Sequence, residues 1–194
     1  MGYVSIEKNV GGLAGLCLLE PRVYADERGW FMETFNPGEL RREGIEFGGV
    51  QENQSCSVKG TLRGLHFQIN HPQGKIVRVV RGEVYDVAVD LRPGSATFGR
   101  HYGAFLSADN RRQLLLPRGF AHGFLTLSDA AEICYMCDEG YHGNDEGGIA
   151  WNDADLEIDW PHVCGDCLDD GTRLILSEKD KGWPTLREML GKRK

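Results

Sequence analysis

The sequence predicts an all-β protein, a sandwich or barrel such as a jelly roll, with a few short helices. The middle of the chain is a succession of short strand-like runs punctuated by glycine. Helical periodicity is confined to residues 37–44 and 183–190. With 194 residues and no repeat, low-complexity segment or dividing linker, the chain is expected to form one domain, 1–194. Many short strands in one domain of this size are typical of these folds.

At the N-terminal end, "GGLAGLCLLE" (11–20) is interpreted as the first strand rather than as an export signal. It lacks a basic leader, and Leu16 separates the small residues from Cys17, which spoils a lipoprotein-type cleavage site. No apolar run approaches the roughly 20 residues that cross a bilayer. We therefore expect a cytoplasmic protein with no membrane partner.

Two strands are predicted next, "KIVRVV" (75–80) and "VYDVAVDL" (84–91), with a tight turn at Gly82. From Asp86 to Leu91 the second run alternates with the period of two expected of a half-buried strand. The segment "RQLLLPRGFAHGFLTLS" (112–128) continues the strand pattern, and its "PRG" predicts a turn.

The charge of the chain excludes one class of function. The formal net charge is -7 and the isoelectric point is about 5.4, so the sequence offers no basic stripe that could match a phosphate backbone. A composition of 41% hydrophobic and 26% charged residues is that of an ordinary soluble globular protein. We expect no nucleic-acid partner.

The six cysteines include two C-x-x-C pairs, Cys134/Cys137 and Cys164/Cys167. Such pairs can form a structural zinc site or a redox pair. However, "AEICYMC" (131–137) resembles a strand, in which positions i and i+3 point to opposite faces. Reduced, mostly buried thiols are the favoured interpretation, and "CGDC", in a loop rich in Gly and Asp, is the stronger candidate for another role.

Three histidines, His66, His101 and His122, stand in or next to predicted strands. A lone strand histidine is more often structural than catalytic, and His101 keeps that interpretation. His66 stands out because an arginine precedes it and Gln68 and Lys75 follow. His122, in "GFAHGF", suggests the close approach of a ligand.

Spacing argues against a metal at His66. Small β-barrels that bind iron or manganese usually offer H-x-H, and Gln68 stands where the second histidine would be. No Glu follows at short range, although two imidazoles and a carboxylate are the minimum for a non-haem iron site. Nucleophilic catalysis is disfavoured because no serine or cysteine stands in a G-x-S-x-G context.

Eight stretches together resemble the dTDP-4-dehydrorhamnose 3,5-epimerase family, in the same order and spacing over residues 12–186. They are "FMETFN", "QENQS", "GTLRGLHFQ", "QGKIVRVVRGEVYDVAVDLR", "TFGRHYGAFLSADNRRQLLLPRGFAHGFLTLSD", "AEICY", "EGGIAWND" and "LSEKD". The resemblance implies a jelly-roll cupin, a homodimer, and no metal or other cofactor. It also implies conversion of dTDP-4-dehydro-6-deoxy-D-glucose to dTDP-4-dehydro-L-rhamnose, with inversion of C3 and C5, in dTDP-L-rhamnose biosynthesis.

By this resemblance His66 is the base, and a neutral imidazole suits that role near neutral pH. Asp180 matches its partner carboxylate. Lys75 matches the cation near the C4 oxygen, and Tyr135 matches the proton donor on the opposite face. The substrate contacts implied by the resemblance are Arg28, Glu33, Gln51, Glu52, Asn53, Arg63, His122, Tyr141, Glu146 and Lys179.

Three local features complicate the match. The family usually has Asp where Glu52 stands, and a tyrosine pair where Gly140 and Tyr141 stand. Arg63 and His66 would face opposite sides of a regular strand, so either Gly64 marks a bulge or one of the two serves a neighbouring subunit.

We expect segment 12–36 to be exchanged or paired in the dimer, where Arg28 and Glu33 would complete the partner's pocket.

Three alternatives remain open. A relative could invert only C3 or only C5, because the number of inversions depends on how the ring lies in the pocket. A cupin could bind sugar nucleotides as a sensor, but it would need neither an acid nor a base. A metal-dependent cupin oxygenase is opposed by the missing H-x-H.

Overall fold

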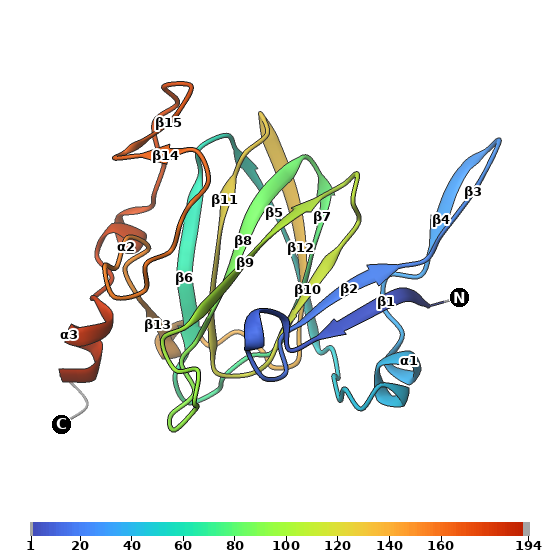
Figure 1. Cartoon of the computed structure of the whole chain (residues 1–194), viewed down its shortest axis with the longest axis horizontal. Coiled ribbons are helices and arrows are strands. Elements are labelled where there is room, and N and C mark those ends of the chain that lie inside the picture. The colour runs from blue at the N-terminus through green and yellow to red at the C-terminus, as the bar shows by residue number, and fades with distance from the viewer. Residues whose placement is uncertain (1, 192–194) are drawn as a thin grey trace.

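The computed structural model describes residues 2–191, and its main feature is a pair of antiparallel sheets that face each other (Figure 1). This confirms the all-β expectation. In sheet order, the six-stranded sheet contains β1 (Tyr3–Lys8), β2 (Cys17–Pro21), β10 (Gln113–Leu116), β7 (Lys75–Arg81), β12 (Ala130–Cys137) and β5 (Gln51–Val58). The five-stranded sheet contains β13 (Glu146–Gly148), β6 (Leu62–Gln68), β11 (Phe120–Thr126), β8 (Glu83–Asp90) and β9 (His101–Ser107).

Two hairpins and several short helices lie outside these sheets. The hairpins are β3 (Val23–Asp26) with β4 (Gly29–Met32), and β14 (Val163–Cys164) with β15 (Cys167–Leu168). The helices are η1 (Val10–Gly12), α1 (Pro37–Arg42), η2 (Gly143–Asp145), α2 (Glu178–Lys181) and α3 (Leu186–Gly191). Both predicted helical pieces are therefore present, although the second begins only at Leu186, after Pro184. None of the helices in the described part has both the length and the apolar character needed to cross a bilayer.

The space between the sheets is filled by apolar side chains from both. Val77 and Ile133 of the six-stranded sheet and Val84 and Phe124 of the five-stranded sheet belong to this core. A second core covers the outer face of the five-stranded sheet, where Trp160 and other residues of the C-terminal segment pack. The two cores bury both faces of the central strands.

The double coverage corrects the prediction for β8. We expected a half-buried strand, but Asp86 and Asp90 are as inaccessible as Val87 and Val89. Asp86 is paired with His122, and the carboxylate of Asp90 is compensated by local hydrogen bonds. Successive side chains of β8 therefore point alternately into the two cores, and neither face of the strand is turned to solvent.

The prediction for 11–20 is also wrong in part. An earlier strand, β1, precedes this segment, and residues 11–16 form part of η1 and a loop, so that β2 begins only at Cys17. The predicted turn at Gly82 is present with φ +72°. It carries the chain from β7 in one sheet to β8 in the other, and a Cβ at Gly82 would lie 2.1 Å from the carbonyl oxygen of Ala130.

Strand β6 contains the bulge that the sequence suggested at Gly64. Register partners His122–His66 and Phe124–Arg63 leave one extra residue on β6. Gly64 has φ +123°, and a Cβ there would lie 2.5 Å from the Cα of Gly123. The bulge places Arg63 and His66 on the same face of the sheet, so the conflict between them disappears.

Candidate active site

A cavity of about 260 Å³ opens between the two sheets. Strands β5, β7 and β12 line one side, β6 and β13 line the other, and two loops complete it. The lining residues are Gln51, Asn53, His66, Phe67, Gln68, Gln73, Lys75, Tyr135, Cys137, Tyr141 and Glu146. A concave site with convergent polar groups is the usual form of a small-molecule binding site.

His66, which lines this cavity, is joined to Asp180 directly beside it. The Nε2 of His66 lies 2.5 Å from Oδ1 of Asp180, which α2 brings from far along the chain. Ser177 caps α2 by accepting from the backbone N–H of Asp180, and its hydroxyl donates to Oδ2. Burial raises the pKa of Asp180, but the hydrogen bonds from His66 and Ser177 outweigh it and leave the pKa below the ordinary value.

This contact determines which nitrogen of His66 is basic. An ionised Asp180 only accepts hydrogen bonds, so Nε2 carries the proton and Nδ1 keeps its lone pair. Nδ1 lies 3.8 Å from Oε1 of Glu146 at the edge of the cavity. The ring of Trp183 makes an edge contact with the imidazole, with centroids 5.9 Å apart. His66 is therefore an oriented imidazole with a free acceptor.

Tyr135 and Lys75 come from the sheet opposite His66. Tyr135 is in the middle of β12, and Lys75 begins β7 beside Cys137. Burial lowers the pKa of Lys75, while the electrostatic influence of the ionisable groups of Cys137, Asp86 and Glu146 acts in the other direction. A base on one wall and a phenol and an ammonium group on the other can act on both faces of a bound ring.

The mouth of the cavity is formed by a linked set of polar side chains. The Tyr141 hydroxyl donates to Glu146 at 2.9 Å, and Lys179 forms an ion pair with the same carboxylate. Burial raises the pKa of Glu146, but the hydrogen bonds from Lys179 and Tyr141 outweigh it and lower the pKa. Gln51 accepts from the backbone N–H of Tyr141 and donates to Asn53.

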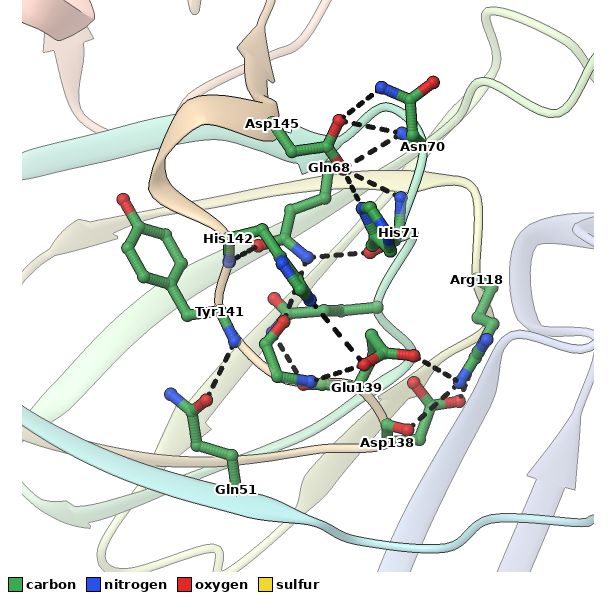
Figure 2. A network of polar contacts seen from close by, with 12 residues as sticks. Gln51, Gln68, Asn70, His71, Arg118, Asp138, Glu139, Tyr141, His142 and Asp145 are labelled. Atoms are coloured by element: carbon green, nitrogen blue, oxygen red, sulfur yellow. Dashed lines mark hydrogen bonds and ion pairs between the residues drawn. The ribbon is translucent and has the colours of Figure 1, made fainter.

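The loop that carries Tyr141 is tied down by Gln68, as Figure 2 shows. The buried Gln68 amide donates to the carbonyl oxygens of His71 and Gly140 and accepts from the backbone N–H of His142. The rings of His71 and His142 stack with centroids 4.2 Å apart and an interplanar angle of 17°. One side chain thus joins the loop after β6 to the loop after β12.

Asp145 makes a second connection between these loops (Figure 2). It accepts from the backbone N–H groups of Asn70 and His71 and from the Asn70 side chain. Burial raises the pKa of Asp145, but these hydrogen bonds outweigh it and lower the pKa to about 2. The carboxylate stays ionised and clamps the loop directly before Glu146.

His122 lies behind the cavity rather than in its lining. Its Nε2 is 2.8 Å from Oδ2 of the buried Asp86, and its backbone pairs with that of His66. The close approach of a ligand that "GFAHGF" suggested stays a prediction, because His122 is not among the described residues that line the cavity. Asp86 also influences Lys75. Its negative charge opposes the loss of the ammonium proton and so acts to raise the pKa of Lys75.

Two predicted contact residues of the N-terminal part lie outside the cavity lining. Arg28 stands at the tip of the β3–β4 hairpin and is paired with Asp26. Glu33 accepts a hydrogen bond from Asn36, the residue that caps α1. Arg28 belongs to the hairpin that extends away from the two sheets, whereas Glu33 follows the end of β4 (Figure 1).

Glu52 and Arg63 also lie outside the lining. Glu52 follows Gln51 on β5 and therefore points to the other face, where it lies 3.6 Å from Arg78. Arg63 is exposed, and its Nε donates to the hydroxyl of Ser57. The remaining predicted site residues meet at the cavity or, in the case of Lys179 and Asp180, directly beside it.

Sequence reasoning missed several residues of the site: Phe67, Gln68, Gln73, Asp86, Cys137, Ser177 and Trp183. For two of them the sequence contains a pattern that indicates their position. Gln68 is two positions from His66 on a strand and therefore shares its face. Ser177 precedes Asp180 in S-x-x-D, a helix-capping pattern.

The C-x-x-C pair of β12 divides between two faces, as predicted. Cys137 lines the cavity, whereas Cys134 lines a small outer pocket with Glu52 and Arg78. All six cysteines are free. Within residues 2–191, no three His, Cys, Asp or Glu side chains are arranged to hold a metal ion.

Comparison with known proteins gives concordant results. The model of the dTDP-4-dehydrorhamnose 3,5-epimerase family matches residues 11–188. The dTDP-4-dehydrorhamnose 3,5-epimerase of Methanothermobacter thermautotrophicus is 54% identical over 91% of this chain and 92% of its own. The crystal structure of the dTDP-6-deoxy-D-glucose-3,5-epimerase of Legionella pneumophila with dTDP-4-keto-L-rhamnose superposes with a TM-score of 0.86 at 44% identity, over 94% of this chain and 93% of that one. A 3′-monoepimerase of Streptomyces bikiniensis in complex with dTDP-quinovose gives 0.81 at 35% identity, over 98% and 91%.

Proposed function

The chain belongs to the dTDP-4-dehydrorhamnose 3,5-epimerase family, and we propose that His66, Asp180 and their neighbours perform this reaction. The enzyme is an isomerase with the cupin jelly-roll fold, and it converts dTDP-4-dehydro-6-deoxy-D-glucose to dTDP-4-dehydro-β-L-rhamnose in dTDP-L-rhamnose biosynthesis. The observation that carries the assignment of roles is the 2.5 Å contact between His66 and Asp180, in a cavity whose opposite wall presents Tyr135.

The chemistry follows from the ketone at C4. The protons at C3 and C5 are acidic because their loss gives an enolate at the C4 oxygen. Nδ1 of His66 takes the proton, and Asp180 stabilises the imidazolium that forms. Lys75 stabilises the developing charge on the C4 oxygen. Tyr135 returns a proton from the other face, and the configuration of the carbon is inverted.

The polar mouth supports a role in holding the nucleotide part. Tyr141 is exposed beside the cavity, where its ring can stack on a base. Lys179 supplies a cation for a diphosphate, and Glu146 holds both side chains in place. Gln51 and Asn53 form the neighbouring edge. A sugar in the cavity and a nucleotide along this mouth would place C4 next to Lys75.

Homodimer formation is part of the proposal, with one epimerase domain per chain acting in the cytoplasm on a nucleotide sugar. The support is the β3–β4 hairpin, which extends away from both sheets and exposes Trp30 and Phe31 (Figure 1). Exposed apolar patches of this kind mark interaction sites. Arg28 at the hairpin tip would complete the pocket of the second subunit.

The second candidate function is inversion at C3 alone, which the similarity to the 3′-monoepimerase favours. Incubation of the dTDP-4-keto-6-deoxy sugar with the enzyme in deuterated water separates the two. We expect deuterium at both C3 and C5 and the L-configured product. Exchange at one carbon only would assign a single-site epimerase.

A further inference from the structure

The hairpin β14–β15 has no role in the proposed reaction, although it carries two cysteines. It lies at the edge of the molecule, beyond α2 and far from the β3–β4 hairpin (Figure 1). Gly165 and Asp166 form its two-residue turn, and Cys164 and Cys167 are register partners on either side. Directly opposed residues of an antiparallel pair have Cα atoms about 4.5–5.5 Å apart, within the range of about 4.4–6.8 Å found in disulfides.

The two thiols face away from the core. Val163 and Leu168 pack in the core that covers the five-stranded sheet, so the alternation of the strands turns both cysteines to the other side. Cys164 is exposed, and Cys167 is half-buried. A reagent in solution can therefore reach the first thiol, and the second stands next to it.

The hairpin is held in place by contacts that do not involve the thiols. The backbone N–H of Leu174 donates to the carbonyl oxygen of Asp166, and Cys167 forms a backbone bridge with Arg173. The side chain of Leu168 is buried. The opposed placement of the cysteines therefore depends on the backbone rather than on an existing bond between them.

The other four cysteines differ from this pair. Cys17, Cys134 and Cys137 are buried, and burial raises the pKa of each thiol, which makes them poor nucleophiles. Cys56 is exposed but stands opposite Glu132 in the sheet rather than opposite another cysteine. It provides a control for exposure without a partner.

We propose that Cys164 and Cys167 form a thiol–disulfide exchange site that takes low-molecular-weight disulfides such as oxidised glutathione. The Cys164 thiolate attacks one sulfur of the reagent, and a mixed disulfide forms as one thiol leaves. Cys167 then attacks the sulfur of Cys164, and the second thiol leaves. The two cysteines are oxidised to a disulfide, and the reagent is reduced to two thiols.

The disulfide would be reversible rather than structural. Stabilisation by a disulfide grows with the length of the loop that it closes, and here the loop has only the four residues from Cys164 to Cys167. A bond with so little stabilising effect is easily reduced. The hairpin lies outside the cavity lining, so epimerisation should proceed at the same rate in both redox states.

The full chain, reduced and then exposed to oxidised glutathione, tests the proposal by mass spectrometry. We expect the peptide containing Cys164 and Cys167 to lose two hydrogens and to resist iodoacetamide until dithiothreitol is added. Cys56, in the same sample, should carry a stable glutathione adduct. Cys167→Ser should retain glutathione on Cys164, because the second attack is impossible.

Three results would overturn the proposal. One is a lasting glutathione adduct on Cys164 in the unsubstituted protein, and another is continued alkylation of both cysteines after oxidation. The third is stoichiometric zinc that is released when these thiols are modified, because two thiolates in a C-x-x-C pair are common zinc ligands. None of these readouts requires epimerase activity, so the outcome is independent of the proposed function.

Discussion

At the scale of single residues, the reaction depends on the imidazole of His66. We expect His66→Asn to keep the fold and to bind dTDP, because asparagine can still donate toward Asp180. Proton exchange at C3 and C5 should fall by about 10⁴-fold, the upper end for a general base, since the neighbouring carboxylate of Glu146 is engaged by Tyr141 and Lys179. Deuterium incorporation measured by NMR checks this. Exchange at the unsubstituted rate would make His66 a structural histidine.

Tyr135→Phe should separate proton exchange from inversion of configuration, whereas His66→Asn should abolish both. The base is intact, so a proton is still removed and solvent deuterium can return from the same side. Inversion should fail, because the wall opposite His66 has lost its proton donor. Comparison of deuterium incorporation with product configuration in one sample checks this. Equal loss of exchange and inversion would assign Tyr135 to binding rather than proton return.

Some site residues could be predicted from the sequence and others could not. His66, Lys75 and Tyr135 could be predicted by resemblance because each stands in a distinctive motif on its own strand. The orientation of Glu52 could not be predicted in the same way, because neighbouring residues of β5 point to opposite faces of the sheet. Gln51 lines the cavity, whereas Glu52 lies on the other face beside Arg78. The burial of Asp86 was missed because a carboxylate in an alternating strand suggests a face exposed to solvent. Here a second apolar layer covers that strand.

At the scale of elements, the loop carrying Tyr141 depends on Gln68. Gln68→Leu keeps the size of the side chain but leaves the N–H of His142 and two carbonyl oxygens without partners, at a cost of about 1–3 kcal/mol for a buried unpaired group. The loop should loosen and KM should rise about tenfold. The turnover number should change little, because the contact between His66 and Asp180 is untouched.

A matched control for Gln68→Leu is Gln54→Leu. Gln54 is an exposed glutamine of β5 whose amide donates to Glu132, away from the cavity. Its substitution should leave both kinetic constants unchanged. A lower melting temperature for Gln68→Leu with an unchanged KM would show that Gln68 supports the fold without positioning the mouth.

Asp145 should make the same loop sensitive to acid. Its pKa is lowered to about 2, so its hydrogen bonds stabilise the folded state fully above the ordinary carboxyl pKa of about 4. This stabilisation is lost as the pH falls from about 4 toward 2, where the carboxylate takes up a proton. Urea unfolding of the unsubstituted protein and of Asp145→Asn should differ by a constant free energy from pH 5 to 7. The difference should shrink at pH 3, and a difference independent of pH would contradict the role of the charge.

Elements with local signals were predicted well, and those decided by distant segments were not. Helix α1 has Asn36 as its cap and Pro37 at its start, and the bulge at Gly64 followed from a conflict of faces within one strand. Strand β1 and the pairing of β14 with β15 lie in stretches with little periodicity. Their formation depends on neighbours that the local pattern does not specify, such as β2 for the first.

At the scale of the whole molecule, the β3–β4 hairpin has little support within a single chain, where the guanidinium group of Arg111 lies over the Trp30 ring at 4.8 Å from its centroid. Tyr24, Trp30 and Phe31 are 45%, 56% and 58% exposed, and Arg28 at its tip contacts only its neighbour Asp26 among the described ion pairs. The cavity, by contrast, has no arginine in its lining. A second copy of the chain would bury the aromatic side chains and bring a guanidinium group, which suits a diphosphate, toward the mouth.

Mixing two inactive variants tests this exchange directly. The His66→Asn subunit has an intact hairpin but no base, and the Arg28→Ala subunit has an intact pocket but no guanidinium group. If the hairpin serves the partner, a mixed dimer contains one complete site, whereas each variant alone contains none. Unfolding the two together and refolding them should restore activity to about a quarter of the unsubstituted level, because random pairing makes half of the dimers mixed. The control is His66→Asn mixed with Asp180→Asn, which damages the same pocket in both subunits of every dimer and should restore nothing. If the first mixture is as inactive as the second while gel filtration shows dimers, Arg28 acts within its own chain or not at all.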